Sequence, residues 1–240
     1  MVSKSVLITG CASGIGKYLA NALQKDNWRV ICTDRVADGN ILPLDLADSN
    51  SIERTVKLVE ELTEGKLYAL INNAGIAYLG KLEDISRDDL RKQFEVNVFG
   101  VHELTNHLVK IFKKSGEGRI INISSVNGKI SFPGMGAYSA SKFALEALTD
   151  ALRLELKGTN IKVSLIEPGT TESDLRSNAI CRNFELKEKK GQSPEIVYRQ
   201  VKHALESRNP RIRYVAGDEY IVYLKYVLPD ALFDRLMAYR

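Results

Sequence analysis

Short apolar runs, rich in β-branched residues, alternate along this chain with longer stretches that have helical spacing. The runs are apolar nearly throughout, as expected of strands buried on both faces of a parallel sheet, and lie at 6–9, 29–33, 67–72, 119–124 and 161–166. The helical stretches lie at 15–24, 51–64, 88–114 and 138–157. This alternation predicts βαβ units, and therefore an α/β fold with a doubly wound parallel sheet flanked by helices.

The remaining segments extend this pattern within one expected domain, residues 1–240. Residues 41–46 and 212–217 are plausible further strands, which brings the expected sheet to about seven strands. Residues 170–192 are polar and charged, which is typical of a loop over a site and equally of an ordinary surface excursion. Residues 212–240 form an apolar C-terminal extension. With 240 residues and 44% hydrophobic content, the chain can bury one substantial core.

Charge and cysteine content exclude several classes of function. The formal net charge is only +4, and no dense Lys/Arg stripe with interleaved aromatic residues is present, so nucleic-acid binding is not expected. The three cysteines have irregular spacing, which predicts neither a zinc site nor a disulfide framework, and no other metal site is expected. The sequence shows no secretory signal pattern and no apolar run long enough to span a bilayer. We therefore expect a reduced, cytoplasmic location.

A glycine-rich segment, "TGCASGIG" at 9–16, directly follows the first predicted strand and opens the first predicted helix. Gly10, Gly14 and Gly16 permit a tight turn and a close approach of the backbone to a ligand. The helix N-terminus behind them offers free N–H groups and a positive dipole end to a pyrophosphate. A glycine cluster alone is often only a turn, but this strand–glycine–helix context is the one that dinucleotide binding requires.

Two acidic residues follow later strands and are candidates for the adenosine end of that site. Asp34 closes the second strand, where a carboxylate can accept hydrogen bonds from both ribose hydroxyls and repel a 2′-phosphate, which favours NAD over NADP. Arg35 weakens this argument, because its guanidinium could pair with the phosphate. Asp45 is a candidate for the adenine amino group, or else an aspartate that forms a turn or a helix cap.

Tyr138 and Lys142 lie four residues apart in "AYSASK", bracketed by small side chains. On a helix they share one face, one turn apart. A surface helix with one aromatic residue and one solvated charge explains the hexapeptide equally well, so its meaning depends on the rest of the chain.

Taken together, these motifs resemble the short-chain dehydrogenase/reductase family in its single-domain form. The resemblance runs from residue 5 to about 170, in family order: "TGCASGIG" (9–16), "NNAG" (72–75), Asn97 in "FEVNVFG", Ser124–Ser125 in "INISS", "YSASK" (138–142) and Pro168–Gly169. Residues 124–156 and 213–236 look most like the branch of retinol and 17β-hydroxysteroid dehydrogenases. The resemblance implies a Rossmann fold and an NAD(P)-dependent oxidoreductase.

The resemblance also assigns catalytic roles. Tyr138 would be the general acid and base, with Lys142 as the cation that lowers the tyrosine pKa and also binds the nicotinamide ribose. The family interval selects Ser125, rather than Ser124, to bind the substrate oxygen together with Tyr138 and to stabilise the developing alkoxide. Asn97 would sit in a local helix distortion and hold a relay water beside Lys142.

The implied cofactor is NAD, with NADP less favoured. Its contacts would come from Tyr138, Lys142 and the following residues: Gly10, Ser13, Gly14, Ile15 and Gly16; Asp34, Arg35, Asp45 and Leu46; Asn73, Ala74 and Gly75; Pro168, Gly169, Thr170 and Thr171. Asn72 would border the adenosine and its ribose and would also help to stabilise the sheet. The family threonine that reaches the carboxamide is not at its usual place, which Ser173 occupies. That contact therefore stays open among Thr170, Thr171 and Ser173.

We expect hydride transfer between the cofactor and a primary or secondary alcohol or carbonyl compound. Phe132, Met135 and the aromatic tail favour an apolar substrate such as a steroid, retinoid or fatty alcohol, although core packing explains these residues equally well. The alternative is a non-catalytic NAD-binding sensor or scaffold on the same fold.

Residues 220–240 are also compatible with binding to a membrane surface, which is a less favoured interpretation than packing on the domain. A homodimer or homotetramer through 88–114 and 138–157 is implied by the resemblance alone.

Overall fold

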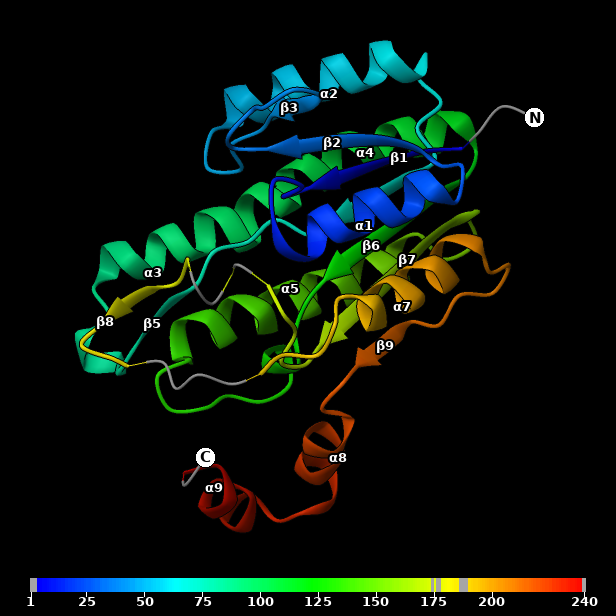
Figure 1. The fold of residues 1–240 in the computed structure, drawn as a ribbon. Helices are drawn as coiled ribbons and strands as arrows, with labels where there is room; N and C mark the ends of the chain where they lie inside the picture. The colour runs from blue at the N-terminus through cyan, green and yellow to red at the C-terminus, as the bar shows by residue number, and fades with distance from the viewer. Residues whose placement is uncertain (1–3, 174, 176–177, 186–189, 239–240) are drawn as a thin grey trace.

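The computed structural model describes residues 4–173, 175, 178–185 and 190–238, and its centre is one parallel seven-stranded sheet (Figure 1). The strand order is β3-β2-β1-β4-β6-β7-β9. The strands are β1 (Ser5–Thr9), β2 (Arg29–Asp34), β3 (Ile41–Pro43), β4 (Ala69–Asn72), β6 (Gly118–Ile123), β7 (Ile161–Pro168) and β9 (Arg213–Ala216). The chain winds outward from β1 to β3, and then crosses back to β4 on the other side of β1. This reversal opens a crevice at the carboxyl ends of β1 and β4.

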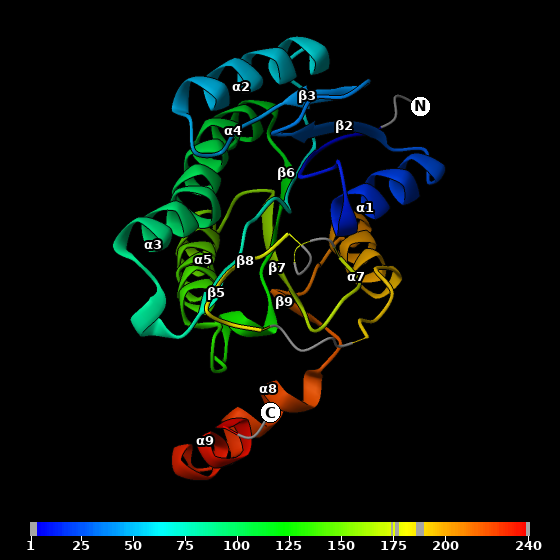
Figure 2. The same cartoon turned by 60° about the vertical axis from the view of Figure 1, so that its left-hand side comes forward.

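Helices cover both faces of the sheet, which confirms the doubly wound α/β fold (Figure 2). One layer holds α1 (Gly14–Lys25) and α7 (Glu195–Glu206), and the other holds α2 (Ser49–Thr63), α4 (Val101–Ser115) and α5 (Gly136–Glu155). The strand β1 shows why its sequence is apolar throughout: Val6 and Ile8 pack with residues of α1 and α7, and Leu7 packs with residues of α2 and α4.

The helix expected at 88–114 is interrupted, as the resemblance implied. It consists of α3 (Arg87–Phe94), a π-helical segment η2 (Glu95–Gly100) and α4. Asn97 lies within the π segment, whose wider turn packs against the loop that follows β3. A Cβ on Gly100 would lie 1.9 Å from the Leu46 carbonyl oxygen, so the two backbones can approach this closely only with glycine. Such π segments are frequent at functional sites.

A second, two-stranded sheet joins β5 (Tyr78–Gly80) to β8 (Ile180–Arg182), and neither strand was expected from the sequence. The pairing brings the described part of the segment at 170–192 over the carboxyl ends of the large sheet. Arg182 also forms a bidentate ion pair with Asp89 of α3, with Nε–Oδ2 and Nη2–Oδ1 distances of 3.0 and 2.7 Å. The segment is therefore tied to the body of the protein by backbone pairing and by charge.

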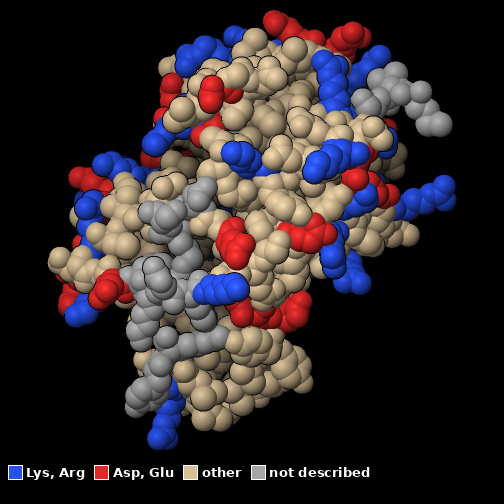
Figure 3. All heavy atoms as spheres, viewed as in Figure 1, with Lys and Arg blue, Asp and Glu red and all other residues tan. Residues whose placement is uncertain are grey.

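The chain ends in two helices, α8 (Glu219–Val227) and α9 (Asp230–Ala238), which lie beyond the end of β9 (Figure 1). Ile221, Phe233 and Met237 bury their side chains against Ile130. On the face shown in Figure 3, basic and acidic side chains are interspersed over the main body, and the region of α8 and α9 is mostly uncharged. Among the described helices, none has the length and apolar character needed to cross a bilayer.

Candidate active site

A cavity of about 1310 Å³ lies in the crevice at the carboxyl ends of the strands. Its walls come from the turns that follow β1, β2, β3, β4, β6 and β7, and from parts of 132–138 and 178–185. The volume exceeds the roughly 300–1,000 Å³ of ordinary small-ligand sites, so it has room for a dinucleotide together with a second molecule.

The glycine turn after β1 forms one end of this cavity. Gly10 has a φ of +75°, a conformation that side chains disfavour, and Gly10, Ser13, Gly14 and Ile15 all line the cavity. Gly16 does not line it: a Cβ there would lie 1.9 Å from the Gly10 carbonyl oxygen. Gly16 therefore allows α1 to pack on the turn, and is not a direct contact. The turn and the N-terminus of α1 fit a pyrophosphate.

The expected adenosine residues line the same cavity, and two of them have a structural bond as well. Asp34 ends β2, and its Oδ2 accepts a hydrogen bond from the Ala12 N–H at 2.9 Å, which orients the carboxylate beside the glycine turn. Asp45 forms a turn, which is the alternative role expected for it, since its Oδ1 accepts a hydrogen bond from the Ala47 N–H at 2.9 Å. Arg35 and Leu46 also line the cavity, and Leu46 is buried.

The segment "NNAG" divides into a structural part and a lining part. Asn72 is buried away from the cavity, and its Nδ2 donates to Thr105 Oγ1 at 3.0 Å and to Asn122 Oδ1 at 2.8 Å. The side chain of Asn72 links β4 to β6 and α4, which is the structural role also expected for it, and it does not line the cavity. Asn73, Ala74 and Gly75 line the cavity as expected. The amide of Asn73 also holds the glycine turn, donating to Gly10 O at 3.1 Å.

Ser125, Tyr138 and Lys142 meet on one wall of the cavity. Ser125 caps the short 3₁₀ helix η3 (Val126–Gly128), where its Oγ accepts from the Asn127 N–H at 3.1 Å. Tyr138 lies in the first turn of α5. The Lys142 Nζ is 5.7 Å from the centre of the tyrosine ring and donates to Ile123 O at 2.8 Å. Ser124 also reaches this wall, and its buried Oγ has no hydrogen-bond partner among the described residues.

Burial controls the ionisation of both members of the Tyr–Lys pair. It raises the pKa of Tyr138 to about 12, against the opposing effect of a hydrogen bond with Ser125. It lowers the pKa of Lys142 to about 8, against the opposing charge of Glu146. The sequence argument expected Lys142 to lower the tyrosine pKa. In this structure the loss of hydration raises the pKa of Tyr138 instead, because both side chains are almost entirely removed from water.

Asn97 supports this wall without lining the cavity. Its Oδ1 accepts from the Ile76 N–H at 2.9 Å, and its Nδ2 donates to Ile76 O at 3.0 Å and to Ser141 Oγ at 3.1 Å. The amide thereby joins the loop after β4 to α5, one residue before Lys142. The relay water expected beside Asn97 stays a prediction.

The wall after β7 contains a residue that sequence reasoning missed. Pro168, Gly169 and the hydroxyl residues at 170, 171 and 173 line the cavity as expected. Asp218, in the turn before α8, also lines it, and its Oδ2 accepts from the Thr170 N–H at 2.9 Å. The Thr171 hydroxyl donates to Gly169 O at 3.2 Å. No motif signals Asp218, because it is 48 residues from its partner.

The opposite side of Tyr138 is an apolar wall. The tyrosine packs with Leu79 and with Met135, Leu175 and Phe184, and Phe132 lines the same part of the cavity. A Cβ on Gly134, which has a φ of +78°, would lie 2.3 Å from the Phe184 ring. Phe132 and Met135 therefore face the cavity as expected, whereas Leu79, Leu175 and Phe184 arrive from segments whose sequence gave no such signal.

Known proteins resemble this chain over most of its length. The family model "short chain dehydrogenase" matches residues 4–181. The uncharacterized oxidoreductase YbbO of Escherichia coli K12 is 40% identical, with 99% of this chain and 95% of that protein covered. The 17-beta-hydroxysteroid dehydrogenase type 6 of Rattus norvegicus is 32% identical, with 98% of this chain and 88% of the rat protein covered.

Solved structures share the fold. A short-chain dehydrogenase from Streptomyces avermitilis has a TM-score of 0.85 and 28% identity, covering 98% of this chain and 95% of that one. One from Burkholderia cenocepacia, in complex with NADP, has a TM-score of 0.84 and 24% identity, covering 98% of both chains. The 3-ketoacyl-(acyl-carrier-protein) reductase of Brucella melitensis, complexed with NADH, has a TM-score of 0.78 and 25% identity, covering 88% and 94%. Proteins of this fold thus bind either dinucleotide.

Proposed function

This chain belongs to the short-chain dehydrogenase family, and we propose that it is an NAD-dependent oxidoreductase acting on an apolar alcohol or its carbonyl counterpart. One observation carries the proposal. Ser125, Tyr138 and Lys142 lie together in one cavity, with a glycine turn at one end and an apolar wall beside the tyrosine. A site that only bound a dinucleotide would have no need of a buried tyrosine next to a buried lysine.

The residues around the cavity fit NAD. Gly10, Ser13 and the N-terminus of α1 would hold the pyrophosphate, and Asp34 would accept hydrogen bonds from the adenosine ribose. The Ala12 N–H keeps the Asp34 carboxylate at this place, where it would repel a 2′-phosphate. On the wall after β7, the Thr171 hydroxyl donates to Gly169 O and could only accept a hydrogen bond from the carboxamide, whereas Thr170 and Ser173 could donate or accept. When bound, the nicotinamide supplies or accepts the hydride.

The protein's own groups would manage the proton. In the oxidation direction the Tyr138 phenolate takes the hydroxyl proton of the substrate, and in the reduction direction the phenol returns it. The Ser125 hydroxyl donates a hydrogen bond to the same substrate oxygen as its negative charge develops. Because burial raises the pKa of Tyr138 to about 12, the phenolate needs a nearby positive charge, which Lys142 provides.

The apolar wall supports a steroid, retinoid or fatty alcohol as the substrate class. Met135, Leu175 and Phe184 offer carbon surface beside the reactive hydroxyl, and burial of such surface contributes about 25 cal/mol per Å². The name of the rat relative, a 17-beta-hydroxysteroid dehydrogenase, agrees with this class.

The test is turnover of a panel of steroid, retinoid and long-chain alcohols with NAD⁺ and, separately, with NADP⁺. We expect turnover with NAD⁺ and its loss in Tyr138→Phe, which removes the proton carrier and keeps the ring. Tyr223→Phe is the matched control, because that tyrosine is 67% exposed on α8, and it should retain turnover. If the parent binds NADH and turns over none of the panel, the sensor or scaffold alternative gains support.

The cytoplasmic location and the homo-oligomer stay predictions.

A further inference from the structure

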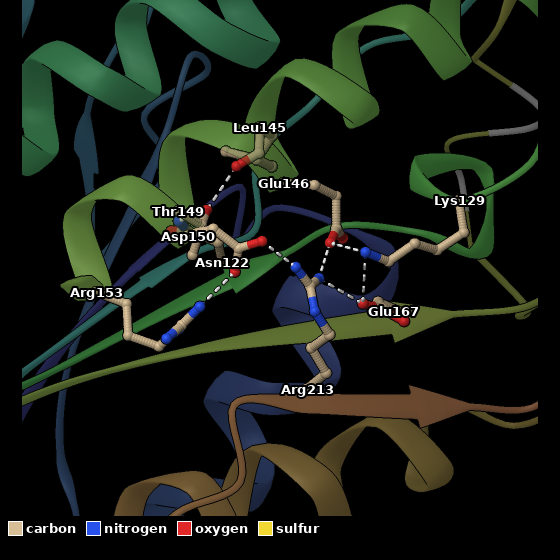
Figure 4. Close-up of polar contacts among 9 residues, drawn as sticks. All are labelled: Asn122, Lys129, Leu145, Glu146, Thr149, Asp150, Arg153, Glu167 and Arg213. Carbon is tan, nitrogen blue, oxygen red and sulfur yellow. Dashed lines mark hydrogen bonds and ion pairs between the residues drawn. The ribbon is translucent and has the colours of Figure 1, made fainter.

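The helix face that carries Tyr138 and Lys142 continues into a buried ion network that the proposed chemistry leaves without a role. Glu146 follows Lys142 by one helical turn, and its carboxylate contacts cations from two other elements (Figure 4). We call Glu146, Glu167, Lys129 and Arg213 the Glu146 network. Its carboxylates are almost completely buried: the Glu146 and Glu167 side chains are 5% and 2% exposed.

The network joins four separate parts of the chain. Lys129, after η3, places its Nζ 2.9 Å from Glu146 Oε2 and 3.9 Å from Glu167 Oε1 at the end of β7. Arg213, at the start of β9, contacts Glu146 as well, and its Nη1 lies 3.0 Å from Glu167 Oε1. Arg213 also reaches Asp150, one turn beyond Glu146 on α5, whose side chain is 37% exposed. Asp150 is therefore the solvent-side end of the same cluster.

One oxygen of this network has no partner of its own. Glu146 Oε1 is buried and makes no hydrogen bond to any described residue. The glycine at 128 allows the close contact, because a Cβ there would lie 3.1 Å from this oxygen. An unpartnered buried carboxylate oxygen is costly, and is retained where the charge has a function. The cation one turn away on the same face is Lys142, which is 5% exposed.

We propose that Glu146 is a positioning residue that keeps Lys142 a cation beneath Tyr138. The inference rests on the proposed function, since it explains how the lysine can serve the tyrosine there. Burial alone favours neutral lysine, and a fixed carboxylate one helical turn away favours the ammonium form. Lys129 and Arg213 hold the Glu146 carboxylate in place on this helix face.

The other charged groups near Lys142 do not replace Glu146. Tyr138 is neutral until it loses its proton, and burial together with the charge of Glu146 raises the pKa of Glu167. Lys129 and Arg213 carry the same sign as Lys142 and oppose its protonation. Asp218 lines the cavity on the β7 side, and is bonded to the Thr170 N–H. Among the groups that act on Lys142, the attraction that counters burial comes from Glu146.

The first experiment uses the nucleotide-free protein and measures the free energy of urea unfolding between pH 6 and pH 10.5. The Lys142 pKa falls from its ordinary value of 10.5 to about 8 in the folded state, so the unfolded chain holds more protons between these values. Stability should therefore rise with pH from about pH 8, and Lys142→Met should abolish that rise. In Glu146→Gln the rise should begin about one pH unit lower or more, because the opposing charge is gone.

Matched variants separate this effect from a general loss of the ion network. Asp150→Asn also removes a carboxylate from Arg213, but it lies two turns from Lys142, so the onset of the rise should stay where it is in the parent. Glu146→Asp should move the onset back toward the parent. Lys129→Met removes a like charge and should shift the onset upward. An onset in Glu146→Gln that coincides with that of Asp150→Asn would overturn the proposal.

The second experiment measures kcat against pH for the same variants, with an alcohol that the parent turns over. The alkaline limb, where Lys142 loses its charge, should move toward lower pH in Glu146→Gln and stay unchanged in Asp150→Asn. The two experiments fail independently. Absence of turnover in the parent would count against the proposed function alone, whereas unchanged stability profiles would refute the role of Glu146 whatever the reaction is.

Discussion

At the scale of single residues, the two adjacent serines after β6 differ in what surrounds them. Ser125 faces the cavity with its hydroxyl fixed by the Asn127 N–H, and this hydroxyl opposes the rise in the pKa of Tyr138. Ser124 is 3% exposed, and its hydroxyl has no partner in the part of the chain that the structure describes. Ser125 is therefore the serine that is placed to act on a substrate oxygen next to Tyr138.

We therefore expect Ser125→Ala to lower kcat by about 10²–10³-fold, the usual cost of losing one donor to a developing oxyanion. Ser124→Ala is the matched control and should change kcat little, because its hydroxyl makes no bond that would be lost. Steady-state kinetics with saturating NAD⁺ measure both. An equal loss in the two variants would contradict the assignment of Ser125.

At the scale of elements, the β5–β8 pair determines how the substrate side of the cavity is covered. The sequence between 170 and 192 predicted a loop, and the structure shows that part of it is a strand tied to α3 by the Arg182–Asp89 ion pair. Arg182 holds the pKa of Asp89 at about 2, well below its usual value. Phe184, which packs on Tyr138, follows this strand by two residues.

Arg182→Met should therefore raise KM for an apolar alcohol several-fold and leave kcat nearly unchanged, since the ion pair does not touch the reacting groups.

The Arg182→Met variant should also be more sensitive to acid. The depressed pKa of Asp89 stabilises the parent above pH 3.8, and that contribution is lost as the pH falls toward about 2. Acid unfolding followed by circular dichroism compares the two proteins. Arg199→Met is the control, because its ion pair is a surface pair within α7, and its acid unfolding should follow that of the parent.

The π segment η2 is the second element whose role depends on its place in the fold. It turns Asn97 toward the loop after β4 and toward the Ser141 hydroxyl, so that the amide links this loop to α5 one residue before Lys142. An uninterrupted α-helix through this stretch would change which side chains face α5, since the π turn holds one residue more than an α turn.

At the scale of the whole molecule, the C-terminal helices α8 and α9 are part of the cavity and of the core at once. Ile221 lines the cavity and packs with Phe233 and Met237, while Asp218 fastens the start of α8 to the wall after β7. The outer face of these helices stays open, with Tyr226 72% exposed.

Phe233→Ala should thus lower the free energy of unfolding by about 3–5 kcal/mol, the usual cost of emptying a buried phenylalanine site, and should weaken NADH binding as well. Tyr226→Ala, on the exposed face of α8, should leave the free energy of unfolding within about 0.5 kcal/mol of the parent. Urea unfolding with and without NADH measures both quantities. Parent-like stability of the phenylalanine variant would show that α9 does not belong to the core.

The sequence by itself determined the fold class and the glycine turn, and its resemblance to a known family determined the placement of Ser125, Tyr138 and Lys142 in one site. The fold class and the turn depend on local patterns, namely apolar strand runs and a strand–glycine–helix turn, whereas a helical spacing of four fits a surface helix equally well. The resemblance, and not the local spacing, placed Asn97 in a distorted helix. It failed for Gly16, because whether a residue lines a cavity or supports its wall depends on the neighbouring segments.

Only the tertiary structure decided the pairing of β5 with β8, the contact of Asp218 with Thr170, and the Glu146 network. Each joins residues that lie far apart in the chain: 63–67 positions separate Arg213 from its partners on α5, and 93 separate Arg182 from Asp89. Such contacts leave no periodic signal, because each partner alone is an ordinary strand residue or surface charge. They also determine the local hydration, and with it the ionisation of Tyr138 and Lys142, since burial is a property of the packed molecule.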